Sequence, residues 1–191
     1  MLMIKMLTLT NFIAKGATRI CFEHPNDAEK CIKVMARFKD EHLLKREIKT
    51  YLNIKYYVGD YLPGYEIELA ETNLGKGLVC ELLRDDNGAF SKPLEDYMKD
   101  HQIGDELKGQ MCNFAYNLVE HDIIFYDFNL RNFIVQIRNG MERLYYVDLK
   151  SYDNYKPMTF LRLEKVITPL AKRIMVRRLK RLFAILNINV K

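Results

Sequence analysis

Five residues in this sequence have the side chains that phosphoryl transfer requires. Lys33 lies among apolar residues typical of a strand, and Glu47 follows in a segment with helical periodicity. Asp127, Asn132 and Asp148 come later in the chain. Phosphoryl transfer needs cations on the phosphate oxygens, oxygen ligands for magnesium, and an acid–base group beside the acceptor hydroxyl. The sequence offers each of these parts, provided that the fold brings them together.

Each of these residues also has an ordinary structural explanation when it is taken alone. Lys33 could be an edge-strand lysine whose charge reaches solvent, Asp127 and Asn132 could form Asx turns, and Asp148 could close the end of a strand. Glu47 is more informative, because the residues three and four positions away from it carry no charge. These neighbours are Leu43, Leu44, Thr50 and Tyr51. We therefore expect the partner of Glu47 to come from another element.

The first part of the chain is predicted to be rich in strands. Alternating or continuous apolar residues between turn residues predict strands over residues 18–23, 30–34, 65–69 and 77–83. The first two form a hairpin around a turn at 24–27, which places Lys33 between apolar neighbours. One helix is predicted over 41–56, because Leu44, Ile48 and Leu52 recur at four-residue intervals.

The second part of the chain is predicted to be mostly helical, with one hairpin. The polar segment 84–92 forms the boundary, and we expect Asp85 and Asp86 to lie in solvent there. A helix is predicted to begin with Ser91 as its cap and Pro93 in its first turn. Further helices are predicted over 105–121 and 159–187. Asn139-Gly140 predicts a tight turn between strands at 133–137 and 144–147, and Asp148 follows the second strand.

The order of these residues resembles the motifs of the protein-kinase-like superfamily. In chain order, the matching segments are Ile32-Lys33, Glu47, residues 127–132, and Asp148-Leu149-Lys150. More narrowly, residues 78–98 and 125–132 resemble the bacterial YrbL-type proteins, the PhoP regulatory network family. The resemblance extends from about Lys15 to Asp153.

This resemblance implies a single kinase-like domain over residues 1–191, of the α+β class. It implies a two-lobe fold with a β-rich N-lobe that holds one helix (residues 1–85) and a mostly helical C-lobe with an inserted β-hairpin (residues 86–191). It also implies ATP and Mg²⁺ as cofactors and phosphoryl transfer to a hydroxyl acceptor. A small molecule, sugar or lipid-like acceptor is favoured over a protein, because too few residues remain for a full protein-kinase second lobe.

The same resemblance assigns roles to individual residues. Lys33 would contact the α- and β-phosphates, and Glu47 would orient it. Asp127 would be the catalytic base, while Asn132 and Asp148 would bind magnesium. The remaining nucleotide contacts would come from a glycine near the phosphates and from a hinge that meets the adenine, namely Gly16 and Glu81, Leu82 and Leu83.

Several kinase features are missing from the sequence. Only Gly16 remains of a glycine-rich loop, and Phe125-Tyr126 stands where kinases usually carry His-Arg. Lys150 replaces the glycine of the Asp-Phe-Gly motif, and no Ala-Pro-Glu element follows. These departures leave an alternative open: a catalytically inactive pseudokinase that acts as a nucleotide-sensing or partner-binding regulatory module.

Composition favours a globular protein of the cytoplasm. The chain of 191 residues is 49% hydrophobic and 29% charged, which suits one domain or one domain with two lobes. No apolar run is long enough to span a bilayer, and we find no secretory signal. The cysteines are widely spaced, which argues against zinc or a disulfide framework and for buried, reduced thiols. They are Cys21, Cys31, Cys80 and Cys112.

The C-terminal segment carries a strong positive charge. Between residues 162 and 181 the only acidic side chain is Glu164, against many lysines and arginines. An apolar stripe is predicted there from Leu163, Ile167, Leu170, Ile174 and Leu182. We expect a helix that packs on the second lobe and has a solvated basic face. An alternative is that the chain uses a kinase-like scaffold only for interactions, and that the basic face binds anionic lipid or nucleic acid.

Overall fold

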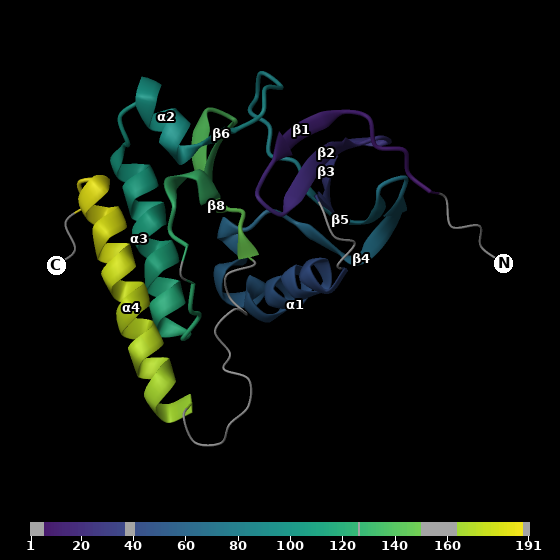
Figure 1. The fold of residues 1–191 in the computed structure, drawn as a ribbon. Helices are drawn as coiled ribbons and strands as arrows, with labels where there is room; N and C mark the ends of the chain where they lie inside the picture. The colour runs from purple at the N-terminus through teal and green to yellow at the C-terminus, as the bar shows by residue number, and fades with distance from the viewer. Residues whose placement is uncertain (1–5, 37–40, 126, 150–163, 189–191) are drawn as a thin grey trace.

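The structure is a computed structural model that describes residues 6–36, 41–125, 127–149 and 164–188. Its first part is an antiparallel five-stranded sheet in the order β1-β2-β3-β5-β4. The strands are β1 (Phe12–Lys15), β2 (Arg19–His24), β3 (Asp27–Met35), β4 (Tyr65–Thr72) and β5 (Gly75–Glu81). Helix α1 (Glu41–Val58) and the short 3₁₀ helix η1 (Gly59–Tyr61) connect β3 to β4, and α1 lies below the sheet in Figure 1.

Both faces of the central strand β3 are covered. Ile32 and Val34 point to one side, where they pack with Leu9 and Val79 in a small cluster. Cys31 and Lys33 point to the other side, because successive residues of a strand alternate between faces. On that side Cys31 belongs to the main core together with Leu44 of α1. Lys33 is therefore held on the face of the sheet that meets the helix and the rest of the molecule.

The second part combines helices with a small sheet. Its helices are α2 (Leu94–Asp100), α3 (Asp105–Glu120), the 3₁₀ helix η2 (Leu130–Asn132) and α4 (Glu164–Ile185). The strands β6 (Lys92–Pro93), β7 (Phe133–Arg138) and β8 (Met141–Tyr146) form an antiparallel sheet in that order. Helices α3 and α4 lie side by side on the outer side of this sheet (Figure 1).

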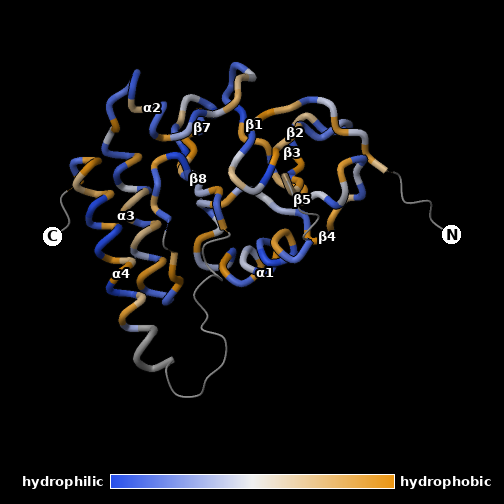
Figure 2. The backbone as a smooth tube through the Cα atoms, in the orientation of Figure 1, coloured by the Kyte–Doolittle hydropathy of each residue, from blue (hydrophilic) through white to orange (hydrophobic). Residues whose placement is uncertain are grey.

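One main core joins the two parts. It contains Leu44 and Leu78 from the first part and Phe114, Phe133 and Leu179 from the second. Hydrophobic and hydrophilic residues alternate along α1, α3 and α4, so each helix can bury one side (Figure 2). The chain is thus of mixed α and β structure, with a β-rich first part and helices concentrated later.

Most of the predicted elements are confirmed. The hairpin around Lys33 is present as β2 and β3, and the hairpin at Asn139-Gly140 is present as β7 and β8. The helices predicted over 41–56 and 105–121 are present as α1 and α3. The strand predicted over 77–83 ends at Glu81. Within the described part of the chain, no helix is both long and apolar enough to cross a membrane.

Three local predictions are wrong. Helix α2 begins at Leu94, and Ser91 does not cap it, because the Ser91 hydroxyl donates to Asp85 Oδ1 at 2.7 Å. Leu52 of α1 is 43% exposed, since Ile54 and Val58 rather than Leu52 continue the buried side of the helix. Asp85 is half-buried rather than solvated, and its carboxylate accepts a hydrogen bond from Ile137 N–H of β7. Asp86 is exposed, as predicted, and accepts from Asn139 N–H at the turn of the β7–β8 hairpin.

The apolar stripe predicted for α4 is also partly wrong. Leu170 is 56% exposed, whereas Leu182 is buried as expected. The side chain of Ile167 and all of Leu163 lie outside the described residues, as does the predicted helix start at 159–163. The buried residues of α4 are Ala171, Met175, Leu179, Leu182 and Phe183, and Leu186 is buried directly after the helix. The stripe was misplaced because several registers of apolar residues on this helix satisfy a helical period.

Candidate functional site

An ion pair between the sheet and α1 forms the centre of the predicted site. Lys33 Nζ on β3 lies 3.2 Å from Glu47 Oε1 on α1. The side chain of Glu47 is 0% exposed and that of Lys33 is 16% exposed. The partner of Glu47 therefore comes from another element, as its uncharged helical neighbours predicted. A buried carboxylate needs such partners, because isolated charge is costly to remove from water.

Two residues that the sequence did not single out complete this centre. Arg19 of β2 forms a second ion pair with Glu47, through Nη1 and Oε2. The Tyr65 hydroxyl donates to Glu47 Oε1 at 3.0 Å and accepts from Lys33 Nζ at 3.2 Å. The register of the hairpin was the available signal for Arg19, since Cys21 opposite Lys33 puts Arg19 on the same face.

Burial shifts the pKa values of both added residues. Loss of solvent lowers the pKa of the Arg19 guanidinium, and the nearby Asp148 carboxylate partly opposes this shift. Burial raises the pKa of the Tyr65 hydroxyl well above its usual value, so this group is a neutral donor at physiological pH. The influence of Asp148 on both groups indicates that its carboxylate lies on the same side of the sheet.

Lys33 also connects the first part of the molecule to the second. Its Nζ donates to the carbonyl oxygen of Val147 at 3.4 Å. Val147 follows directly after β8, and Asp148 is the next residue. The fold therefore brings the lysine of the sheet to the end of the hairpin, across 114 positions of sequence.

The loop at residues 127–132, which precedes the hairpin, is hydrogen-bonded to Val147 as well. Val147 N–H donates to the Asn132 carbonyl at 2.9 Å. Asn132 Nδ2 donates to the Asp127 carbonyl at 3.2 Å, and the Tyr146 hydroxyl donates to the same carbonyl at 3.0 Å. These hydrogen bonds link Asp127, Asn132 and Asp148 to the Lys33 centre through a short series of contacts.

The loop itself is shaped by local capping. The Asn129 side chain accepts from Arg131 N–H at 3.0 Å and so caps η2. Arg131 is in turn paired with Glu95 of α2. The Asp127 side chain is exposed, whereas Asn132 is half-buried and its side chain points back to the Asp127 carbonyl.

The donor atoms at this place suit a hard cation. Because Asn132 uses its Nδ2 as a donor, its Oδ1 is the atom available as a ligand. Asp148 adds carboxylate oxygens. Within the described residues there is no cluster of three or more His, Cys, Asp or Glu that could hold a metal ion. Mg²⁺ does not require one, since it is commonly held by one or two protein groups together with phosphate oxygens and waters.

The residues predicted to contact the nucleotide lie on the first part of the molecule. Gly16 is in the turn between β1 and β2, where its N–H donates to the Arg19 carbonyl at 2.8 Å. Glu81 ends β5, and its N–H donates to the Gly64 carbonyl at 2.7 Å. Leu82 N–H donates to Glu29 O at 2.8 Å, and Leu83 O accepts from Ser91 N–H at 3.0 Å. Much of the backbone of the predicted hinge is thus already hydrogen-bonded within the protein.

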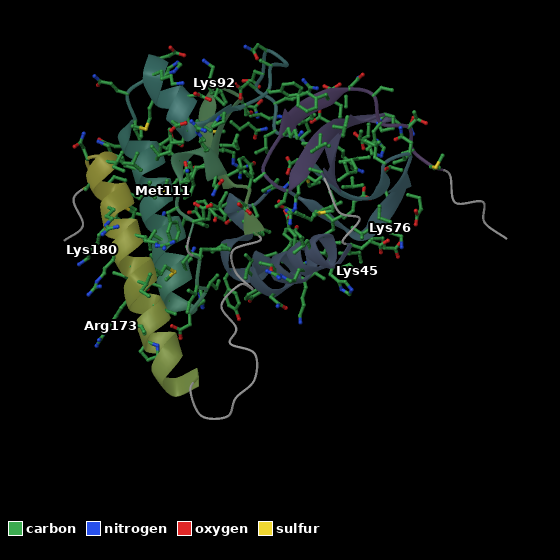
Figure 3. The ribbon with its side chains drawn as sticks, viewed as in Figure 1. Lys45, Lys76, Lys92, Met111, Arg173 and Lys180 are labelled. Atoms are coloured by element: carbon green, nitrogen blue, oxygen red, sulfur yellow. The ribbon has the colours of Figure 1, made fainter. Side chains whose placement is uncertain are left out.

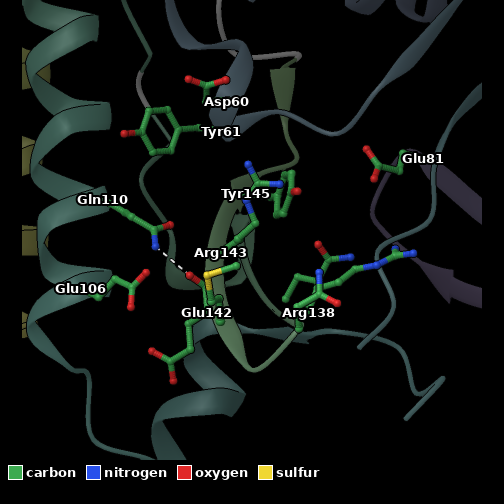
Figure 4. Close-up of a pocket in the computed structure, with 12 residues that line it drawn as sticks. Asp60, Tyr61, Glu81, Glu106, Gln110, Arg138, Glu142, Arg143 and Tyr145 are labelled. Atoms are coloured by element: carbon green, nitrogen blue, oxygen red, sulfur yellow. Dashed lines mark hydrogen bonds between the residues drawn. The ribbon is translucent and has the colours of Figure 1, made fainter. Parts of the chain in front are cut away.

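A cavity of about 740 Å³ lies elsewhere, between α3, the β7–β8 hairpin and η1 (Figure 4). Glu106 and Gln110 line it from α3, and Glu142 and Arg143 line it from β8. Gln110 Nε2 donates to the Glu142 carbonyl at 2.7 Å across the cavity. Among the predicted site residues, Glu81 alone lines this cavity. The cavity is therefore distinct from the Lys33 centre.

The basic helix is present as α4. Arg173, Arg177, Lys180 and Arg181 are exposed. Figure 3 shows Arg173 and Lys180 on the side of α4 that faces away from α3. Lys172 instead pairs with Asp122 at 2.6 Å. A solvated basic face is therefore present, and its binding to anionic lipid or nucleic acid stays a prediction.

Comparison with known proteins identifies relatives of this chain. Residues 6–187 match the family described as PhoP regulatory network protein YrbL. The uncharacterized protein YrbL of Escherichia coli strain K12 is 30% identical over 89 residues. YrbL of Shigella flexneri aligns with the same identity and length. Each alignment covers 44% of this chain and 42% of the relative. Because the family match spans most of the sequence, the chain belongs to the YrbL family of PhoP regulatory network proteins.

Proposed function

We propose that this chain has a protein-kinase-like two-lobe fold and binds ATP with Mg²⁺ between its sheet and its β7–β8 hairpin. We further propose that it transfers the terminal phosphoryl group to a hydroxyl acceptor. One observation carries the proposal: the buried Lys33–Glu47 pair, whose ammonium also reaches the carbonyl just before Asp148. A lysine held by a helix carboxylate beside metal-ligand oxygens is the arrangement that phosphoryl transfer uses.

In this proposal each residue has a role that follows from the charge of its side chain. Lys33 neutralises phosphate oxygens, and Glu47 keeps its ammonium in place. Asn132 and Asp148 hold the magnesium ion through oxygen atoms, which supplies further positive charge to the phosphates. Asp127 is exposed beside them and orients the acceptor hydroxyl. We favour a small molecule, sugar or lipid-like acceptor, because the chain of 191 residues lacks an Ala-Pro-Glu element.

A specific observation supports the alternative of an inactive regulatory module. An ammonium group has three N–H donors, and Lys33 Nζ has three protein acceptors. These are Glu47 Oε1, the Tyr65 hydroxyl and the Val147 carbonyl. Phosphate would have to displace one of them, and the Val147 contact, at 3.4 Å the longest, is the one to yield. In a regulatory module, nucleotide binding would break this contact without any transfer of phosphate. Such a module would use the same residues.

Nucleotide binding is tested by thermal unfolding with ATP in the presence and absence of Mg²⁺. We expect ATP to raise the melting temperature only when Mg²⁺ is present, because binding to the folded state stabilises it. Asp148→Asn should abolish this shift. Asp60→Asn is the matched control, since Asp60 is an exposed aspartate at η1 that lines the separate cavity. No ATP-dependent shift in the wild-type chain would contradict the proposal.

Turnover is tested separately by release or transfer of the terminal phosphate from labelled ATP. We expect activity in the wild-type chain and a loss of at least about tenfold in Asp127→Asn, with the nucleotide shift retained. A wild-type chain that binds ATP and Mg²⁺ but transfers no phosphate to water, to itself or to a panel of hydroxyl acceptors would instead identify the regulatory module.

A further inference from the structure

Three cysteines lie on the same face of the sheet as Lys33. Cys21 of β2 stands opposite Lys33 in the strand register, and Cys31 precedes Lys33 by two positions on β3. Cys80 of β5 stands directly opposite Cys31. All of these cysteines are free thiols, and Cys31 and Cys80 are buried.

The pair formed by Cys31 and Cys80 is unusually close. Their Sγ atoms are 3.3 Å apart. Residues directly opposite on antiparallel strands have Cα atoms about 4.5–5.5 Å apart, which lies within the range of about 4.4–6.8 Å that disulfides require. Cys21 is diagonal to Cys31 rather than opposite, and diagonal positions are farther apart. The sheet therefore favours one pairing, Cys31 with Cys80.

The surroundings of Cys80 favour its thiolate form. A hydrogen bond from Cys31 lowers the pKa of Cys80 to about 7, and the cations of Lys33 and Arg19 act in the same direction, although burial opposes them. The pKa of Cys31 is raised well above its ordinary value, because its thiol is engaged by Cys21 and Cys80. A low-pKa thiolate next to a protonated thiol is the usual combination of attacking and resolving cysteine.

We propose that Cys31 and Cys80 form a redox site that a peroxide converts to a cross-strand disulfide. A small oxidant has a route to it, because Cys80 lines a cavity of about 360 Å³ bordered by Tyr51, Tyr65 and Glu66. The site adjoins Lys33 on the same strand face, and its oxidation does not depend on nucleotide binding.

The chemistry balances with hydrogen peroxide as the oxidant. The Cys80 thiolate attacks one peroxide oxygen, the O–O bond breaks, and hydroxide leaves, so Cys80 becomes a sulfenic acid. Cys31 sulfur then attacks the Cys80 sulfur, the S–O bond breaks, and the Cys31 proton leaves with the hydroxyl as water. The two sulfurs are oxidised by two electrons in total, and the peroxide is reduced to hydroxide and water.

Peptide mapping tests the pairing directly, because trypsin separates the three cysteines. Cleavage after lysine and arginine places Cys21 in residues 20–30, Cys31 in residues 31–33 and Cys80 in residues 77–84. The full chain is reduced, freed of reductant, exposed to hydrogen peroxide, and quenched in denaturant with N-ethylmaleimide. We expect a peptide pair joining 31–33 to 77–84, lighter by two hydrogen atoms than the separate peptides and lost on treatment with dithiothreitol.

Two variants sharpen the test. Cys80→Ser should remove the linked pair and leave Cys31 alkylated, whereas Cys112→Ser, which alters a half-buried cysteine on α3, should leave the linked pair unchanged. If Cys80→Ser does not fold, the wild-type map still decides the matter. Alkylation of both Cys31 and Cys80 after peroxide, or a link between Cys21 and Cys31 in place of the predicted one, would overturn the proposal.

Discussion

Glu47 shows how one buried side chain organises several others. Its two carboxylate oxygens face different cations, with Lys33 at Oε1 and Arg19 at Oε2. Those cations are themselves largely buried, at 16% and 13% exposure. Removing one member of such a set leaves charge that neither solvent nor protein neutralises. The stability of this buried group of charges therefore depends mainly on Glu47.

We expect Glu47→Gln to lower the free energy of unfolding by about 3 kcal/mol, because two buried cations lose their counter-charge. Urea titration followed by circular dichroism measures this change. Glu41→Gln is the matched control on the same helix, where Glu41 pairs with Lys45 and Lys76 at the surface. The control should leave the urea midpoint unchanged. Equal effects of the two substitutions would contradict the special role of Glu47.

At the scale of the element, the pairing of β3 with β5 depends on a glycine. A Cβ added at Gly77 would lie 2.4 Å from Ile32 Cγ2 and 3.3 Å from Val34 Cγ1. The two strands and the small cluster behind them leave no room for a methyl group. Gly77 is therefore required by packing rather than by backbone conformation.

We expect Gly77→Ala to lower the free energy of unfolding by about 1–3 kcal/mol, the usual cost of overpacking a well-filled core. Gly109→Ala should do the opposite and stabilise the protein by about 0.5–1 kcal/mol, because alanine favours a helix interior. Gly109 lies in α3, and a Cβ there would meet nothing within 4 Å. Thermal and urea unfolding of both variants measure the contrast, and a stabilising Gly77→Ala would contradict it.

The β7–β8 turn is fixed by its sequence and by a distant carboxylate. Asn139 and Gly140 have φ values of 54° and 70°, as a type I′ turn requires. Their N–H groups donate to Asp86 at 3.0 and 3.2 Å. These backbone hydrogen bonds lower the pKa of Asp86 below its ordinary value of 3.8. The ionised carboxylate thus stabilises the hairpin next to the candidate site.

The lowered pKa of Asp86 predicts how stability depends on pH. The contribution of Asp86 is fully present above its unfolded pKa and is lost as pH falls through the lower folded pKa. Asp86→Asn should therefore be less stable than the wild type at pH 7. The difference in free energy of unfolding between the two proteins should narrow as pH falls below 3.8. Urea unfolding across this range measures both proteins. A gap that stays constant with pH would show that Asp86 acts only through its shape.

At the scale of the whole molecule, the C-terminal helix completes a core that begins in the N-terminal sheet. Met175 of α4 is 0% exposed and belongs to the same cluster as Leu78 of β5 and Phe133 of β7. A core shared in this way predicts that the two parts unfold together. It also keeps the Lys33 centre and the β7–β8 hairpin in fixed positions relative to each other.

We expect Met175→Ala to lower the free energy of unfolding by about 2–5 kcal/mol, as is usual when a large buried side chain is truncated. Far-ultraviolet circular dichroism and tyrosine fluorescence should report the same loss in one shared transition. Met141→Ala, at a methionine that is 55% exposed, should change little. Separate transitions for the two probes would show that the parts unfold independently.

The sequence alone determined the strands around Lys33, the helices α1 and α3, the Asn139-Gly140 hairpin and the family. These are features of local periodicity, turn chemistry and motif order, which neighbouring residues specify. Only the tertiary structure decided that Arg19 and Tyr65 share Glu47, and that Cys31 faces Cys80. It also decided that Lys33 reaches Val147. Such contacts join residues far apart in the chain, and they depend on strand order and on the packing of helix against sheet, which no local pattern encodes.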